Sequence, residues 1–398
     1  MALRPLLRWV PPAYTPIPAS SLSQAARDLV LRRDPRQDLE ALLTERFEAA
    51  RVVLTDSGTS ALQLAIGLTT SREVPGRSGV ALPAFACFDL VTAVLGAGFD
   101  PVFYDVAPET LEPDWTSFES AIGNVRVVVV APLFGLPAGI DRARALSAEV
   151  GVHLIEDAAQ SIGSSPGGRH WGTLGDSTIL SFGRGKGWTG GGGGALLLRD
   201  GDHAAEPRLA APPASGRMLA ASAAQWLLGH PSRFGVPARL PGLHLGETRY
   251  HPPTPTRRMA PGSASLILST RPAAEAEADQ RRQRARGMIG GIMGDADRWS
   301  AEAGYLRLPV LMPSGQEAEA FAHEYRRLGV ARSYPTPLPR LEVLAETPQR
   351  TGRHPGAERL AARLVTLPTH SLAKDAELEH VVGAARQAGG RVVGPAPA

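Results

Sequence analysis

Short apolar runs, each ended by turn residues, recur through the first 200 residues of the chain. Runs of this length predict buried strands, and the segments between them carry apolar residues at helical spacing. The expected strands are residues 51–56, 80–83, 101–106, 125–130, 152–155 and 177–182. Strands that alternate with helices predict a doubly wound, mostly parallel α/β domain, with the apolar run 125–130 near its centre.

The rest of the pattern divides the chain into further parts. Residues 1–20 predict an extended arm because their prolines exclude regular helix, and a helical pattern follows over 22–50 with a break at Asp34-Pro35. Residues 201–255 are rich in Pro and Ala and contain a helix over 218–228, and a long helix follows to about Met288. We therefore expect an arm and helix over 1–40, a large domain over 41–255 with an insertion at 201–255, and a smaller α/β domain over 256–398.

The candidate catalytic residues follow two of the expected strands. The run 152–155 ends in Glu156 and Asp157, and the run 177–182 leads into a glycine-rich turn that holds Lys186. Catalytic groups in open α/β sheets gather at strand ends. A lysine amine can form an imine with the aldehyde of pyridoxal phosphate (PLP), and a carboxylate can keep the pyridine nitrogen protonated. Asp157 and Lys186 are thus the predicted catalytic pair.

Lysine usage supports this reading of Lys186. The chain has 42 Lys and Arg residues, of which only Lys186 and Lys374 are lysines. Arginine cannot form an imine because its guanidinium stays protonated, so a lysine here indicates that the amine itself is needed. The alternatives are a surface charge at Lys186 and, at Asp157, an N-cap for a helix that starts at Ala158.

A candidate phosphate site lies earlier in the chain. The strand 51–56 is followed by Ser57, Gly58 and Thr59, a turn of small residues that opens a helix. The first amides of a helix lack partners and carry the positive end of its dipole, so they suit a phosphate. The alternative is a plain strand–turn–helix in which Ser57 or Thr59 caps the helix.

Three motifs in order, EDAAQ at 156–160, GTLGD at 172–176 and SF-x-x-x-K at 181–186, resemble the DegT/DnrJ/EryC1/StrS family. The resemblance implies a fold-type-I, PLP-dependent aminotransferase, mostly acting on nucleotide-linked keto sugars, that works as a homodimer. It implies that Gly58, Thr59 and Ser181 hold the cofactor phosphate. It also implies that Gln160, placed one helical turn after Asp157, lies near the ring oxygen or the substrate.

The chain departs from the family pattern at several positions. Cys87 stands where the family places an aromatic ring over the cofactor, so we assign the stacking role to Phe88, with Phe85 as the second choice. Thr256 replaces an asparagine that reaches the partner subunit's phosphate site, Gly192 replaces a glutamate and Pro339 a histidine. These changes indicate an outlying member of the family, and its amino acceptor need not be an ordinary nucleotide sugar.

Composition excludes other classes of function. With 43% hydrophobic and 20% charged residues and a net charge of +3, the chain is typical of a soluble protein without a nucleic-acid partner. A single cysteine, Cys87, rules out an internal disulfide and agrees with a reducing compartment. No signal-peptide pattern, apolar stretch of membrane-spanning length or metal site is predicted, so we expect a cytoplasmic protein.

The sequence thus predicts transfer of an amino group from an amino-acid donor to the keto group of a small molecule, a nucleotide-linked sugar or a related precursor of a polysaccharide or natural product. Two alternatives stay open. One is a sugar-modifying PLP enzyme other than a transaminase; relatives that dehydrate their substrate replace the lysine by histidine, and Lys186 argues against this. The other is a non-catalytic scaffold or regulator that retains the fold.

Overall fold

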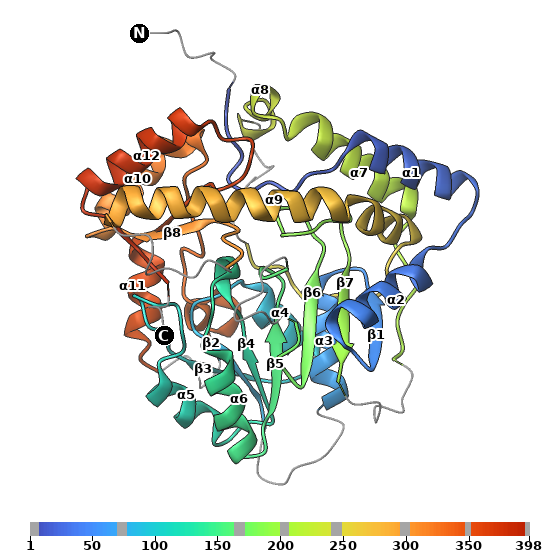
Figure 1. Ribbon diagram of the computed structural model, residues 1–398. Coiled ribbons are helices and arrows are strands. Elements are labelled where there is room, and N and C mark those ends of the chain that lie inside the picture. The colour runs from blue at the N-terminus through green and yellow to red at the C-terminus, as the bar shows by residue number, and fades with distance from the viewer. Residues whose placement is uncertain are drawn as a thin grey trace.

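The computed structural model describes residues 8–69, 78–162, 172–199, 207–239, 249–294, 303–346 and 352–394. Its central feature is a seven-stranded sheet with strand order β1-β7-β6-β5-β4-β2-β3 (Figure 1). The strands are β1 (Arg51–Thr55), β2 (Val80–Pro83), β3 (Pro101–Tyr104), β4 (Val127–Val130), β5 (His153–Asp157), β6 (Ser177–Ser181) and β7 (Gly194–Leu198). Strand β7 runs antiparallel to both its neighbours, and β6, β5, β4, β2 and β3 are mutually parallel. The predicted mostly parallel sheet is confirmed.

Helices cover both faces of this sheet, as a fully buried parallel sheet requires. Alternate residues of β4 face opposite layers: Val127 and Val129 belong to one apolar cluster, and Val128 and Val130 to another. The first cluster includes residues of α3 (Gly58–Thr69) and α4 (Asp89–Gly96). The second includes residues of α5 (Trp115–Ile122) and α6 (Ile140–Glu149).

A second sheet lies in the C-terminal part of the chain. It has four antiparallel strands in the order β11-β8-β10-β9. Its strands are β8 (Leu308–Leu311), β9 (Ala331–Arg332), β10 (Leu364–Leu367) and β11 (Arg391–Val392), and the helices of this region are α10 (Gly315–Tyr325), α11 (Pro355–Arg363) and α12 (Asp375–Gln387). Within the described ranges, short 3₁₀ segments are at Leu133–Gly135, Pro237–Arg239, Arg326–Leu328, Leu338–Arg340 and Glu342–Leu344.

One long helix, α9 (Pro261–Met293), runs across the molecule between these parts (Figure 1). At one end it packs against α1 (Ala19–Val30), α2 (Arg36–Phe47) and α7 (Ser215–Leu228), and at the other against α12 and β11. The helical pattern predicted over 22–50 is thus two helices, separated near Asp34-Pro35. The short α8 (Pro231–Phe234) follows α7; parts of the predicted insertion, 201–206 and 240–248, lie outside the described residues. No helix in the described ranges is long and apolar enough to cross a membrane.

The segment after β5 corrects one expectation. A helix was expected to start at Ala158, but residues 158–162 form a turn. Asp157 Oδ1 accepts a hydrogen bond from the amide of Ala159 at 3.0 Å, which is two residues away and closes this local turn. Asp157 is therefore not the N-cap of a helix at Ala158, and Gln160 does not lie one helical turn after it.

Asp105, just beyond the end of β3, connects the large sheet to helix α11 of the C-terminal part. Its carboxylate accepts hydrogen bonds from the amides of Gly356 and Ala357, each at 2.8 Å, at the first turn of α11. It also accepts one from Val106 at 2.9 Å. A Cβ at position 356 would lie 2.0 Å from the carbonyl oxygen of Val106, so only glycine allows this approach. A side chain of the large sheet thus caps a helix of the C-terminal part.

We predict that Asp105→Ala lowers the free energy of unfolding by about 2–4 kcal/mol, because three buried amides lose their acceptor. The matched control is Asp114→Ala, which removes the exposed cap that accepts from Ser117 at the start of α5 and should cost about 1 kcal/mol. Urea unfolding followed by circular dichroism measures both. An equal decrease in the free energy of unfolding in the two variants would contradict the role of Asp105 in connecting the large sheet to α11.

Candidate active site

A pocket opens at the carboxyl ends of the parallel strands. It is lined by residues that follow β2, β4, β5 and β6 and by the first turn of α3. The sequence-predicted residues that line it are Gly58, Thr59, Asp157, Gln160, Ser181 and Lys186. Open α/β sheets bind their ligands at this edge.

Asp157 is a buried carboxylate that faces this pocket. Its side chain is 8% exposed, and Oδ1 is held by the Ala159 amide. Burial raises the pKa of Asp157, while the charge of Lys186 lowers it and that of Asp89 raises it further. Among the described residues, Oδ2 has no hydrogen-bond partner. One oxygen therefore fixes the carboxylate, and the other is available to a ligand that donates a proton.

Glu156 has a different role, although it is the neighbour of Asp157. Side chains alternate along a strand, so the two carboxylates leave β5 in opposite directions. Glu156 is fully buried and accepts hydrogen bonds from the amides of Gly172, Leu174 and Gly175 at 2.6, 3.0 and 3.1 Å. It holds the GTLGD loop in place, so its role is structural.

Lys186 lies in the turn between β6 and β7. The turn is tight: Gly185 has φ 72°, and the Lys186 amide donates to the Gly183 carbonyl at 3.4 Å. The hydroxyl of Thr15 donates to the Lys186 carbonyl, so the N-terminal arm also holds this turn. Lys374, the other lysine, is exposed at the N-cap of α12. Of the two amines, only that of Lys186 lines the pocket.

The start of α3 and the end of β6 form a narrow cradle. A Cβ at Gly58 would lie 2.8 Å from Cβ of Ser181, so glycine is required for the two segments to meet. The Ser181 hydroxyl has no partner among the described residues. The Ser57 hydroxyl instead accepts the amide of Ser60 at 3.1 Å and caps α3, and Ser57 does not line the pocket. Gly58, Thr59 and Ser181 remain the residues positioned for a phosphate.

Gln160 is fixed by groups from two distant parts of the chain. Its Oε1 accepts the amide of Phe134 at 3.1 Å, and its Nε2 donates to the hydroxyl of Tyr334 at 2.7 Å. Tyr334 has φ 48°, a left-handed conformation that costs energy for a bulky residue and persists only where the surroundings enforce it. Tyr334 is therefore a positioning residue for Gln160.

The aromatic residues after β2 do not line the pocket. Phe88 is 5% exposed within the apolar core, and Phe85 packs edge-on against Tyr334 with ring centroids 5.6 Å apart. Cys87 lines the pocket in their place. Burial raises the pKa of the Cys87 thiol to about 12, so this side chain is uncharged. The assignment of Phe88 as the stacking residue stays a prediction.

The residues present fit PLP. A cradle that excludes a Cβ, the unpartnered Ser181 hydroxyl and the first turn of α3 suit its phosphate, and the open oxygen of Asp157 suits its ring nitrogen. Lys186 supplies the amine. When bound, PLP supplies an aldehyde that binds amines and a ring that withdraws electrons from them. The fold and the site together define a PLP-dependent transferase of fold type I.

Comparison with protein families identifies the group more closely. The model of the DegT/DnrJ/EryC1/StrS aminotransferase family matches residues 24–235, more than half of the 398 residues. The chain belongs to this PLP-dependent family.

The similar curated proteins include a regulatory protein and aminotransferases. The chain is 24% identical to a pleiotropic regulatory protein of Geobacillus stearothermophilus, over 86% of each chain. It is 34% identical to a UDP-N-acetyl-3-dehydro-α-D-glucosamine 3-aminotransferase of Acidithiobacillus ferrooxidans, over 36% of this chain and 38% of the other. It is 37% identical to an L-glutamine:2-deoxy-scyllo-inosose aminotransferase of Streptomyces paromomycinus, over 37% of this chain and 34% of the other. The last two matches span little more than a third of those relatives.

Solved structures show the same fold. AtS13 from Actinomadura melliaura superposes with a TM-score of 0.73 at 21% identity, over 96% of this chain and 99% of the other. The aminotransferase TlmJ from Streptoalloteichus hindustanus superposes with a TM-score of 0.70 at 24% identity, over 96% and 98%. The likeness in fold therefore extends well beyond residues 24–235.

Sequence reasoning missed two residues of this site. Asp89 lines the pocket, and its charge raises the pKa of Asp157. Its position just after the expected strand at 80–83 was the available signal. Tyr334 reaches Gln160 from 174 residues away, and no local pattern in the sequence pointed to this contact.

We predict that Gly58→Ala weakens PLP binding by about tenfold to a hundredfold, because the new methyl group meets Ser181 in the cradle. The matched control is Gly67→Ala on the same helix, where a Cβ would have nothing within 4 Å. It should leave PLP affinity unchanged and stabilise the helix by about 1 kcal/mol. Spectrophotometric titration measures the affinity; parent-like binding by Gly58→Ala would place the phosphate elsewhere.

Proposed function

We propose that this protein is an aminotransferase that uses PLP to move an amino group from an amino-acid donor to a keto group of a sugar-related precursor. The observation that carries the proposal is the joint position of Lys186 and Asp157 in one pocket, beside the cradle of Gly58 and Ser181. Family membership supports the reaction class. The names of the relatives support an acceptor with a sugar or cyclitol ring.

Each side chain has a role that follows from its surroundings. The Lys186 amine is placed to bind the cofactor aldehyde, and, once released by an incoming amine, to move a proton to or from the substrate carbon. The Asp157 carboxylate holds a proton on the pyridine nitrogen, because burial strengthens a charge pair that water would weaken. Gln160, held by Tyr334, faces the ring or the substrate.

The departures from the family pattern bear on the acceptor. The wall after β2 has Cys87 where an aromatic ring is expected, and α7 and α8 stand in the segment that we interpret as an insertion. We propose an acceptor other than an ordinary nucleotide-linked sugar, used for a polysaccharide or a natural product. The proposed location is the cytoplasm, in agreement with the single cysteine.

One observation favours a second candidate function. The relative that matches over 86% of both chains is named a regulatory protein, and the relatives named as aminotransferases match over shorter segments. A regulator could keep the fold and the cofactor without turnover. The pocket argues for the enzyme because Lys186 and the open oxygen of Asp157 are both retained.

We predict that the parent protein converts PLP to its amine form when an amino-acid donor is added, and that Asp157→Asn slows this half-reaction by about a hundredfold to several thousandfold. The nearly isosteric amide keeps the shape but removes the charge that holds the ring proton, a loss of about 3–5 kcal/mol. Lys186→Ala should abolish conversion and still retain cofactor. Rapid spectrophotometry with a panel of donors measures all three proteins.

The outcomes separate the two candidate functions. Conversion by Asp157→Asn at the parent rate would refute the role of Asp157. A parent protein that binds PLP tightly but converts no donor would favour the regulator. Lys374→Ala is the control for loss of a lysine, and it should convert donor at the parent rate.

We also predict a homodimer at micromolar concentration, with a mass near twice the 42.0 kDa of the chain. The turn at Arg258-Met259 resembles the partner-side loop of the family; Met259 is buried, whereas Arg258 is exposed beside β1. Light scattering measures the mass. A monomer with full transamination activity would show that this turn does not complete a neighbour's site.

A further inference from the structure

A second, larger cavity adjoins the pocket of Lys186. Its volume is about 650 Å³, within the range of small-molecule sites, and Cys87 and Asp89 line both cavities. Its other walls come from the N-terminal arm, from the segments around α8 and residues 249–251, and from Arg307 just before β8. A molecule that reacts at Lys186 can therefore extend into this space.

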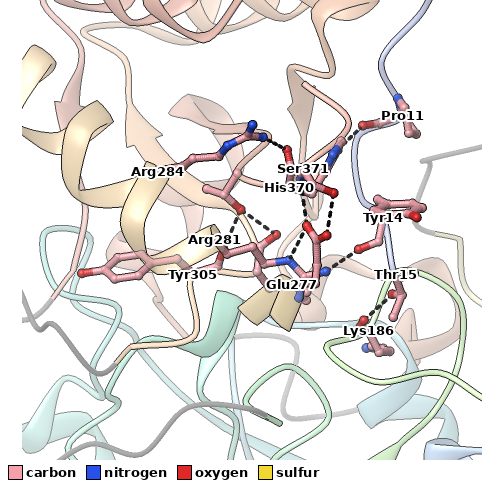
Figure 2. Close-up of polar contacts among 12 residues, drawn as sticks. Pro11, Tyr14, Thr15, Lys186, Glu277, Arg281, Arg284, Tyr305, His370 and Ser371 are labelled. Atoms are coloured by element: carbon pink, nitrogen blue, oxygen red, sulfur yellow. Dashed lines mark hydrogen bonds and ion pairs between the residues drawn. The ribbon is translucent and has the colours of Figure 1, made fainter. Parts of the chain in front are cut away.

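The arm that forms one wall is tied down by buried polar contacts (Figure 2). Arg281 of α9 is 1% exposed and donates to the Tyr14 carbonyl. His370 Nε2 donates to the Pro11 carbonyl at 2.9 Å, and burial lowers the pKa of His370 to about 3, so the ring is neutral at physiological pH. Thr15 donates to the Lys186 carbonyl. The wall is thus part of the folded structure and is connected to the Lys186 turn.

The lining of the cavity is biased toward positive charge. Three arginines line it, Arg184, Arg249 and Arg307, whereas Asp89 is the one carboxylate among its lining residues. Low-dielectric walls of one charge sign attract ligands of the opposite sign.

Arg307 is partly buried, and its partners differ from those of Arg281, the fully buried arginine of this region. Its one hydrogen bond to the described residues is long, 3.4 Å from a terminal nitrogen to the Gly329 carbonyl, and its buried Nε has no partner. No carboxylate in the described ranges lies within 4.0 Å of it. Burial lowers the pKa of Arg307 to about 10. Arg281, by contrast, has the carboxylate of Glu277 at 4.0 Å.

A partly buried guanidinium with an unpartnered buried Nε and no carboxylate nearby destabilises the fold, so its presence beside a cavity indicates a ligand of opposite charge. The guanidinium presents several donors in a planar fork that matches the oxygens of a carboxylate or a phosphate. The free Nε and the weakly bonded terminal nitrogen leave such donors available.

We infer that Arg307 binds an anionic group, a carboxylate or a phosphate, of the substrate whose reacting carbon lies at Lys186. The description of the bound molecule as a substrate rests on the proposed function. It assigns the cavity between the arm, α8 and β8 as the specificity pocket for small anionic molecules. Binding of the anion is independent of any turnover and is measured separately.

The test is calorimetric binding of anions without an amine to the PLP-saturated protein: glutarate as the carboxylate, methyl phosphate as the phosphate and 1,5-pentanediol as the neutral control. Arg307→Gln should weaken binding of the preferred anion by about tenfold to a hundredfold. Arg217→Gln removes the same charge from an exposed position on α7 and should leave the affinity unchanged. The anion that binds more tightly shows whether Arg307 prefers a carboxylate or a phosphate, and 1,5-pentanediol should not bind.

Thermal unfolding of the same variants distinguishes a ligand site from a structural role. Removal of an unpartnered charge should leave the melting temperature of Arg307→Gln unchanged or raise it, whereas a structural arginine would lower it. Equal anion affinity in Arg307→Gln and the parent, or no anion binding by the parent, overturns the inference. Glutarate is also titrated without PLP, so a protein that fails to transaminate but binds glutarate through Arg307 refutes the proposed function alone.

Discussion

The close backbone approach between β7 and the start of α3 is the constraint on which the site depends. A Cβ at Gly194 would lie 2.3 Å from the carbonyl oxygen of Ser57, so no side chain fits between the two segments. This contact brings the first turn of α3 next to Ser181 at the end of β6. Strand β7 runs antiparallel to β6 and places Gly194 opposite Ser181. The cradle forms because position 194 has no side chain. Gly194, the last residue of the glycine run 190–194, is therefore required for the contact between β7 and the start of α3.

The number of hydrogen bonds distinguishes the roles of three buried carboxylates. Glu156 and Asp105 each accept three amide hydrogen bonds, and each thereby joins segments that would otherwise separate. Asp157 accepts one and has an oxygen open to the pocket. A carboxylate that is satisfied by the backbone stabilises structure, whereas one that is buried and left incomplete is poised for a ligand.

The sequence predicted the strand ends and the residues on them because both depend on local pattern. Asp157 and Lys186 follow short apolar runs bounded by turn residues, a pattern typical of buried strands, and the alternation of strands with helices predicted the mostly parallel sheet. The turn after Asp157 was mistaken for a helix because a side-chain bond to the Ala159 amide outweighed helical propensity. Tyr334 and Arg307 could not be placed, because each approaches the site from a segment well over 100 residues from Lys186, and periodicity contains no information on such contacts.

The anchoring of the N-terminal arm has a consequence for the order of assembly during synthesis. The arm contacts Lys186, Arg281, His370 and Glu377, the last two near the far end of the chain. During synthesis the arm emerges before all four of these residues. The arm therefore acquires its full set of contacts, including those that support the Lys186 turn, only after residues 370–377 have been synthesised.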